Sequence, residues 1–158
     1  MAGVQQSGNV TPGHLASFVT DGVIADAGAN PYSQRVLATL LNASFNTTAD
    51  QPILLPAALQ AFQLTGIIIA NPSASLTTAA GGFYPTISKG GSAIVAAGQV
   101  YTALTSSLLL MNATLTAYAQ AQYFTRSQLT NWAIYLSLTT PQGSDIAANV
   151  YIVGIELL

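Results

Sequence analysis

Charged side chains are nearly absent from this sequence of 158 residues. Only 5% of the residues are Asp, Glu, Lys or Arg, whereas about 25% is usual in a soluble domain. The basic residues are Arg35, Lys89 and Arg126, and the formal net charge is −2. Proteins that bind nucleic acid or an anionic membrane surface carry clusters of basic residues. We therefore expect neither nucleic acid nor a membrane surface among the partners.

Cysteine is missing as well, and histidine occurs once. The chain consequently has no disulfide and no thiolate metal ligand. The one set that could complete a Ser-His-Asp triad is His14 with Asp21 or Asp26, but it lies in a Gly-rich segment, and no G-x-S-x-G motif is present. Asp21 and Asp26 also lack the dense acidic spacing of a calcium loop. We expect no catalytic residue, no metal and no cofactor, and thus a protein that is not an enzyme.

Long apolar runs are the third absence. Although 51% of the residues are hydrophobic, the runs LTGIIIANP and SSLLLMNAT are soon interrupted by polar or turn residues, and a spanning helix needs about 20 apolar residues. The N-terminus also lacks the basic and apolar regions of a signal peptide. We expect a soluble protein with a neutral Ser, Thr, Asn and Gln surface. Such a surface favours self-association, because interface centres are depleted of charge.

Residues 1–30 form a block of their own, rich in Gly and interrupted by Pro12. A helix is unfavourable here, because it would have to include that proline and several glycines. The composition predicts extended pieces joined by turns at Pro12-Gly13 and Asp21-Gly22. We interpret residues 1–30 as an extended arm that docks on a partner. The docking residues we expect are Val10, Pro12, His14, Leu15, Phe18, Val23 and Ile24.

Residues 31–158 show short apolar or alternating runs between turn signals such as NP, GG, KGG and PQG. This pattern predicts an all-β domain, a jelly-roll-like β-sandwich. Residues 56–64 and 114–123 have helical alternatives. Lys89-Gly90-Gly91 predicts a hairpin turn rather than a phosphate-binding loop. The expected strands cover residues 36–45, 51–56, 63–72, 81–88, 92–97, 107–115, 121–127, 132–140 and 148–157.

Aromatic residues occur along the expected strands, and two explanations of them remain. Sugars stack on exposed rings, so the rings could contact a glycan. Large rings at strand positions more often fill a core or an interface, which is the interpretation we favour. The residues concerned are Phe83, Tyr84, Tyr101, Tyr118, Tyr123, Phe124, Trp132, Tyr135 and Tyr151.

The segment SGNVTPGHLASFVTDGVIADAG resembles an N-terminal segment of structural proteins from tailed bacteriophages. In those proteins V-T-P-G-H is followed by an apolar and aromatic stretch, then by D-G-V and D-x-G, in front of differing β-rich bodies that include tail fibres. The body, which ends in ANVYIVGIELL, is similar in pattern and size to the jelly-roll cement or decoration proteins of phage capsids. The matching positions of the arm are Val10, Thr11, Pro12, Gly13, His14, Asp21, Gly22, Val23, Asp26 and Gly28.

The resemblance implies a non-enzymatic virion protein, made in the host cytoplasm, that binds the outside of the major capsid protein and stabilises the head. The few charges and the strands rich in Ala, Thr and Tyr predict a homo-oligomer. The resemblance favours a homotrimer, because capsid ornaments often occupy three-fold positions, with a dimer as the alternative. A second hypothesis is an adaptor or receptor-binding module of the phage tail, in which the arm plugs into the tail and the β body contacts a host glycan. A small hydrolase is the third hypothesis, and the scarcity of titratable residues disfavours it.

Overall fold

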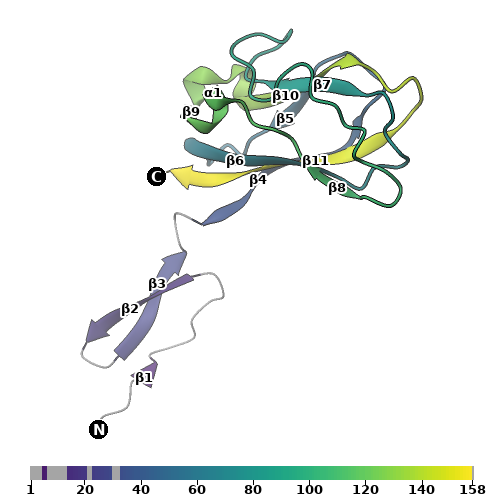
Figure 1. Ribbon diagram of the computed structural model, residues 1–158. Coiled ribbons are helices and arrows are strands. Elements are labelled where there is room, and N and C mark those ends of the chain that lie inside the picture. Colours follow the sequence, from purple (N-terminus) through teal and green to yellow (C-terminus); the bar gives the residue numbers. More distant parts are fainter. Residues whose placement is uncertain (1–4, 7–13, 21–22, 30–32, 158) are drawn as a thin grey trace. The chain divides into compact units, whose positions relative to one another are not determined.

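The computed structural model describes residues 5–6, 14–20, 23–29 and 33–157. The chain divides into two compact units, Met1–Ser33 and Gln34–Leu158. Strands dominate both units (Figure 1). Every strand pair of the second unit is antiparallel.

The first unit is a small sheet of three strands. Strands β2 (His14–Thr20) and β3 (Val23–Ala29) pair antiparallel, with Phe18 opposite Ile24. The short strand β1 (Gln5–Gln6) pairs parallel with β3. The expected turn residues Pro12-Gly13 and Asp21-Gly22 lie outside the described residues.

The second unit is built from two sheets, which Figure 1 shows as two layers. The larger sheet has the order β4-β11-β6-β8, and β9 pairs with β6 beyond this path. The smaller sheet has the order β5-β10-β7. The strands of the larger sheet are β4 (Gln34–Ser44), β11 (Ala147–Leu157), β6 (Ala61–Ala70), β8 (Leu110–Asn112) and β9 (Tyr123–Thr125). Those of the smaller sheet are β5 (Gln51–Leu54), β10 (Ala133–Thr140) and β7 (Ala80–Tyr84).

This architecture confirms the prediction of an all-β sandwich. The finer expectation of a jelly roll is not confirmed: the strand number of eight agrees, but the strand orders β5-β10-β7 and β4-β11-β6-β8, with β9 beside β6, do not by themselves establish the two Greek keys of that fold.

The core lies between the two sheets and includes alternate residues of the segment 132–140, which was expected to be a strand. Trp132, Ile134, Leu136 and Leu138 all belong to it, as strand periodicity required. Phe62 is central to an aromatic cluster, with its ring centroid 5.5 Å from that of Phe124 and 5.9 Å from that of Trp132. Offset and edge-to-face pairs at such distances are favourable, so these rings hold the two sheets together.

One predicted strand is wrong. Residues 92–97 form no strand, and Val95 makes only isolated bridges, to Phe83 and to Leu115. The backbone N–H groups of Ile94 and Val95 both donate to the carbonyl oxygen of Phe83. Because the two amides share one acceptor, the regular spacing of a ladder is lost at this point. The apolar run was a correct sign of burial, since Ile94 and Val95 are fully buried.

The helical alternatives were largely wrong. Residues 56–64 contain a turn followed by the start of β6, and residues 114–123 contain only the one-turn helix α1 (Ala117–Gln120). Thr116 caps α1, since its hydroxyl accepts from the N–H of Ala119 at 3.3 Å and donates to the carbonyl of Ala93 at 2.7 Å. Two 3-10 turns, η1 (Arg126–Gln128) and η2 (Thr130–Trp132), join β9 to β10.

The prediction of a turn around Lys89 is confirmed. The N–H of Gly90 donates to the carbonyl of Ile87 at 3.1 Å, which closes a four-residue turn. Its two central residues, Ser88 and Lys89, have φ values of 57° and 56°. Positive φ at both central positions defines a type I′ turn. The adjoining bridge between Thr86 and Gly90 is antiparallel.

Candidate functional site

The arm residues expected to dock fall into two groups. Val10 and Pro12 lie outside the described residues. His14, Leu15 and Phe18 belong to β2, while Val23 and Ile24 belong to β3. The ladder therefore brings five of the seven predicted docking residues onto two adjacent strands, with Phe18 paired to Ile24.

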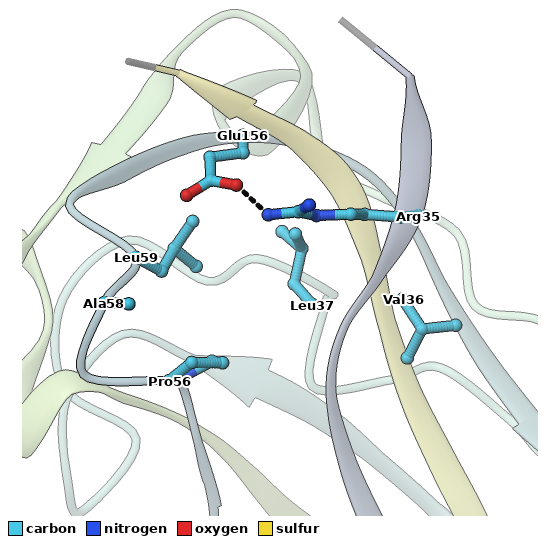
Figure 2. A pocket seen from close by; sticks show the side chains of 7 residues that line it. All are labelled: Arg35, Val36, Leu37, Pro56, Ala58, Leu59 and Glu156. Carbon is cyan, nitrogen blue, oxygen red and sulfur yellow. Dashed lines mark ion pairs between the residues drawn. The ribbon is translucent and has the colours of Figure 1, made fainter. Parts of the chain in front are cut away.

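The sandwich itself contains a pocket that the sequence did not reveal. It has a volume of about 300 Å³ and lies where the start of β4 and the end of β11 face the turn after β5. Figure 2 shows Arg35 and Leu37 reaching from β4 toward Glu156 and Leu59. Its lining residues are Arg35, Val36, Leu37, Pro56, Ala58, Leu59 and Glu156.

An ion pair closes one side of this pocket. The guanidinium of Arg35 contacts the carboxylate of Glu156 (dashed in Figure 2). The side chains are 54% and 26% exposed, and exposed pairs of this kind contribute little to stability. Arg35 is the second residue of the first strand of the sandwich and Glu156 the next-to-last of the final strand. Because these strands run antiparallel, the start of the first lies beside the end of the last. The opposite charges at these two ends could therefore have predicted the ion pair from the sequence.

The opposite wall of the pocket is a turn held by hydrogen bonds. The indole N–H of Trp132 donates to the carbonyl of Pro56 at 3.0 Å. The guanidinium of Arg126 donates to the carbonyls of Ala57 and Leu59 and lies 4.9 Å from the centre of the Trp132 ring. Such a cation–π contact is attractive. The pocket wall is therefore fixed by side chains from the β9–β10 connection.

The chemistry of the pocket suits binding of an apolar group. Aliphatic side chains and Pro56 form most of the lining, and its charged groups are the paired Arg35 and Glu156. Among the described residues, no group of three or more His, Asp or Glu side chains is placed to hold a metal ion. A small apolar side chain of a partner would fit, with polar contacts at the ion pair.

A second, shallower depression surrounds the exposed ring of Tyr123. It has a volume of about 380 Å³ and is lined by Gln122, Tyr123, Thr125, Ser127 and Gln128. The Tyr123 side chain is 59% exposed. The hydroxyl of Thr125 lies 3.0 Å from that of Ser127 and donates to the amide oxygen of Gln128 at 3.1 Å. An open ring beside fixed amide and hydroxyl groups is suited to a neutral polar ligand.

Most aromatic residues named from the sequence fill the interior. Phe83, Tyr84, Tyr101, Phe124, Trp132 and Tyr135 are all buried, which confirms the core interpretation for them. Tyr118 and Tyr123 remain exposed. Burial raises the pKa of the Tyr84 phenol, and it raises the pKa of Tyr101 further, with an added contribution from Tyr84.

A comparison of the chain with protein-family models, with curated proteins and with solved structures finds no match. In the described part of the chain, the helices lack the length and apolar character required to cross a membrane.

Proposed function

We propose that this protein is a non-enzymatic structural component of a tailed-phage virion, a decoration protein that binds the outside of the major capsid protein and stabilises the head. The N-terminal unit is the docking element, and the sandwich is the part displayed on the capsid surface. The protein acts as a homo-oligomer, and it needs no cofactor or metal.

The observation that carries this proposal is the organisation of the first 33 residues. The segment that resembles the phage motif forms a compact unit of its own, ahead of a separate sandwich. A small unit with apolar residues on paired strands can dock as one body, so less backbone freedom is lost on binding than for an unstructured arm.

The charge distribution supports the same role. All three basic residues lie in the second unit, together with Asp50, Asp145 and Glu156, whereas the first unit carries only the acids Asp21 and Asp26. Within the second unit, Arg35 pairs with Glu156, and the Asp145 carboxylate accepts a hydrogen bond from the Asn46 side chain at 3.0 Å. A neutral sandwich repels neither its own copies nor a shell, which favours dense packing on a particle.

The direct test is the place and copy number of the protein in purified virions. We expect hundreds of copies per particle and density on the outer capsid surface in an electron cryomicroscopy map. The purified protein should also rebind shells from which it has been removed and raise their melting temperature, because a ligand of the assembled state stabilises that state. Complete absence from the virion would contradict both head and tail versions of the proposal.

The depression around Tyr123 favours a second candidate function, a receptor-binding or adaptor module of the tail. Its exposed ring and neighbouring amides match the needs of a host glycan. A copy number of a few to some tens per particle, with density at the tail, would support this candidate over the first.

A further inference from the structure

The larger sheet differs from an ordinary sandwich sheet on its outer side. Antiparallel sheets with one solvated face alternate apolar and polar residues along each strand. In β11 the residues Val150 and Ile152 point into the core, but the intervening positions Tyr151, Val153 and Ile155 are also largely apolar. The strand is therefore apolar on both faces.

The register shows that this outer face is continuous across the sheet. One row runs from Thr39 through Tyr151 and Ile68 to Asn112. Val153 is only 7% exposed, although it does not belong to the core between the sheets. Its cross-strand neighbours are Val36, which is 54% exposed, and Gly66, where an added Cβ atom would meet nothing within 4 Å. An apolar centre therefore lies open on the outside of the sheet.

A further row runs from Gln34 through Ile155 and Gln63 to Tyr123. Amide, hydroxyl and tyrosine side chains thus border the apolar centre. In both rows, no position carries Asp, Glu, Lys or Arg. The Arg35–Glu156 pair occupies the alternate positions of β4 and β11, on the side of the core.

The outer side of the smaller sheet, unlike that of the larger sheet, is in contact with another segment of the same chain. Ser137 of β10 pairs with Gly82 of β7, and Ser137 is 1% exposed. A Cβ atom on Gly82 would lie 2.4 Å from the carbonyl oxygen of Val95 and 3.1 Å from the carbonyl carbon of Ala96. The segment that pairs with β7 at Val95 therefore closes over Gly82, and the hydroxyl of Thr139 on β10 donates to the carbonyl of Ala97 in the same segment at 3.0 Å. On the larger sheet, by contrast, Leu110 at the β8 edge is 51% exposed.

We propose that the outer face of the larger sheet binds the same face of a second copy of this chain. In a two-fold pairing the same surface of both copies is in contact, and a face without charges makes that contact without like-charge repulsion. The five strands of this sheet have 11, 11, 10, 3 and 3 residues. At about 3.4 Å per residue and about 4.8 Å between strands, they give a face of about 600 Å². Specific, stable interfaces bury about 600–1,000 Å² per partner, so one face-to-face contact reaches the lower end of the range for a stable dimer.

The proposal is independent of the role in the virion, and it makes a dimer the basic unit. Sheets pack face to face with their strands within about 30° of each other. Tyr151 and Ile68 lie at the centre of the proposed contact, and Leu110 lies at its edge.

The test is sedimentation equilibrium of the full-length protein and three Lys variants. Tyr151→Lys places a charge at the centre of the face, and Leu110→Lys places one at an exposed edge position where folding is not at risk. Leu54→Lys is the matched control, because Leu54 is 66% exposed on β5 of the other sheet. We expect a dimer at micromolar concentration, at least a tenfold higher dissociation constant for the two face variants, and no change for the control.

Several results would overturn the pairing. One is a native protein that stays monomeric at about 100 µM, where a dimer with a micromolar dissociation constant would be mostly formed. Another is an equal effect of Leu54→Lys and Leu110→Lys. A trimer weakened by the face variants would mean that the face meets a different surface of its neighbour. A monomer that binds phage capsids but loses this binding with Tyr151→Lys would show that the face contacts the capsid shell. This result would contradict the pairing and leave the proposed function intact. A dimer that does not bind capsids would support the pairing and contradict the proposed function.

Discussion

The hydroxyl of Tyr101 donates a hydrogen bond to the carbonyl oxygen of Gly81, at a distance of 3.0 Å. Tyr101 is fully buried, and its ring meets that of Phe45 edge-on with 5.1 Å between centroids. A residue of the long β7–β8 connection is thereby fixed to β7 and to the residue that follows β4.

Replacing Tyr101 by Phe should destabilise the protein without changing its fold. The substitution keeps the ring contact with Phe45 but leaves the buried carbonyl of Gly81 without this donor. We expect a loss of about 1–2 kcal/mol in the free energy of unfolding, measured by urea denaturation. Tyr118→Phe is the control, since the half-exposed Tyr118 hydroxyl can exchange its partners with water. Equal losses for the two variants would show that the Tyr101 hydrogen bond contributes nothing specific.

Stability should also fall at alkaline pH. Burial raises the pKa of Tyr101 and of Tyr84 above the ordinary value of 10.0. Because the unfolded chain releases these protons first, their contribution is fully present below about pH 10 and is lost as the pH rises above it. Denaturation midpoints between pH 9 and 12 test this. The decline should be shallower in Tyr101→Phe, and an unchanged decline would assign it to other groups.

Two glycines offer a sharp comparison of backbone requirements. A Cβ atom on Gly82 would lie 2.4 Å from the carbonyl oxygen of Val95, whereas one on Gly98 would meet nothing within 4 Å. Gly82→Ala should therefore destabilise the protein by more than about 2 kcal/mol through overpacking. Gly98→Ala should be neutral or slightly stabilising, because it restricts the unfolded chain. Thermal melts of both variants check the pair, and similar melting temperatures would contradict the close approach at Gly82.

The sequence predicted the sandwich because its inner strands are strongly patterned. The alternation of Trp132, Ile134, Leu136 and Leu138 placed all four residues in the core. Edge elements were less predictable. The expected strand at 107–115 shrinks to β8 (Leu110–Asn112), since it pairs with β6 alone and only at three positions.

The candidate sites depend on relations that one sequence does not contain. The pocket beside Arg35 needs the turn that Trp132 and Arg126 hold, and those residues lie more than 65 positions from Pro56 and Ala57. The apolar outer face could be suspected from ANVYIVGIEL, where both alternating sets are apolar. Its extent depends on the order of strands β4, β11, β6 and β8, and on register shifts in the β4–β11 and β6–β11 pairs.

The proposed arm should adhere to a capsid through apolar contacts and not through charge. The first unit has no basic residue, so adhesion should come from apolar burial and from backbone hydrogen bonds to a neighbouring strand. Burying a Phe side chain contributes about 1.5–3 kcal/mol. Phe18→Ala should then weaken binding to capsid shells about tenfold or more.

Co-sedimentation with shells lacking the protein measures this effect, and Ser17→Ala, at the adjacent position of β2, is the matched control. Binding should be nearly the same at low and at physiological ionic strength, because screening acts on charge pairs and not on apolar contacts. If occupancy instead falls steeply with added salt while Phe18→Ala has no effect, the capsid recognises the carboxylates of Asp21 and Asp26, and the apolar residues of the arm serve only its own folding.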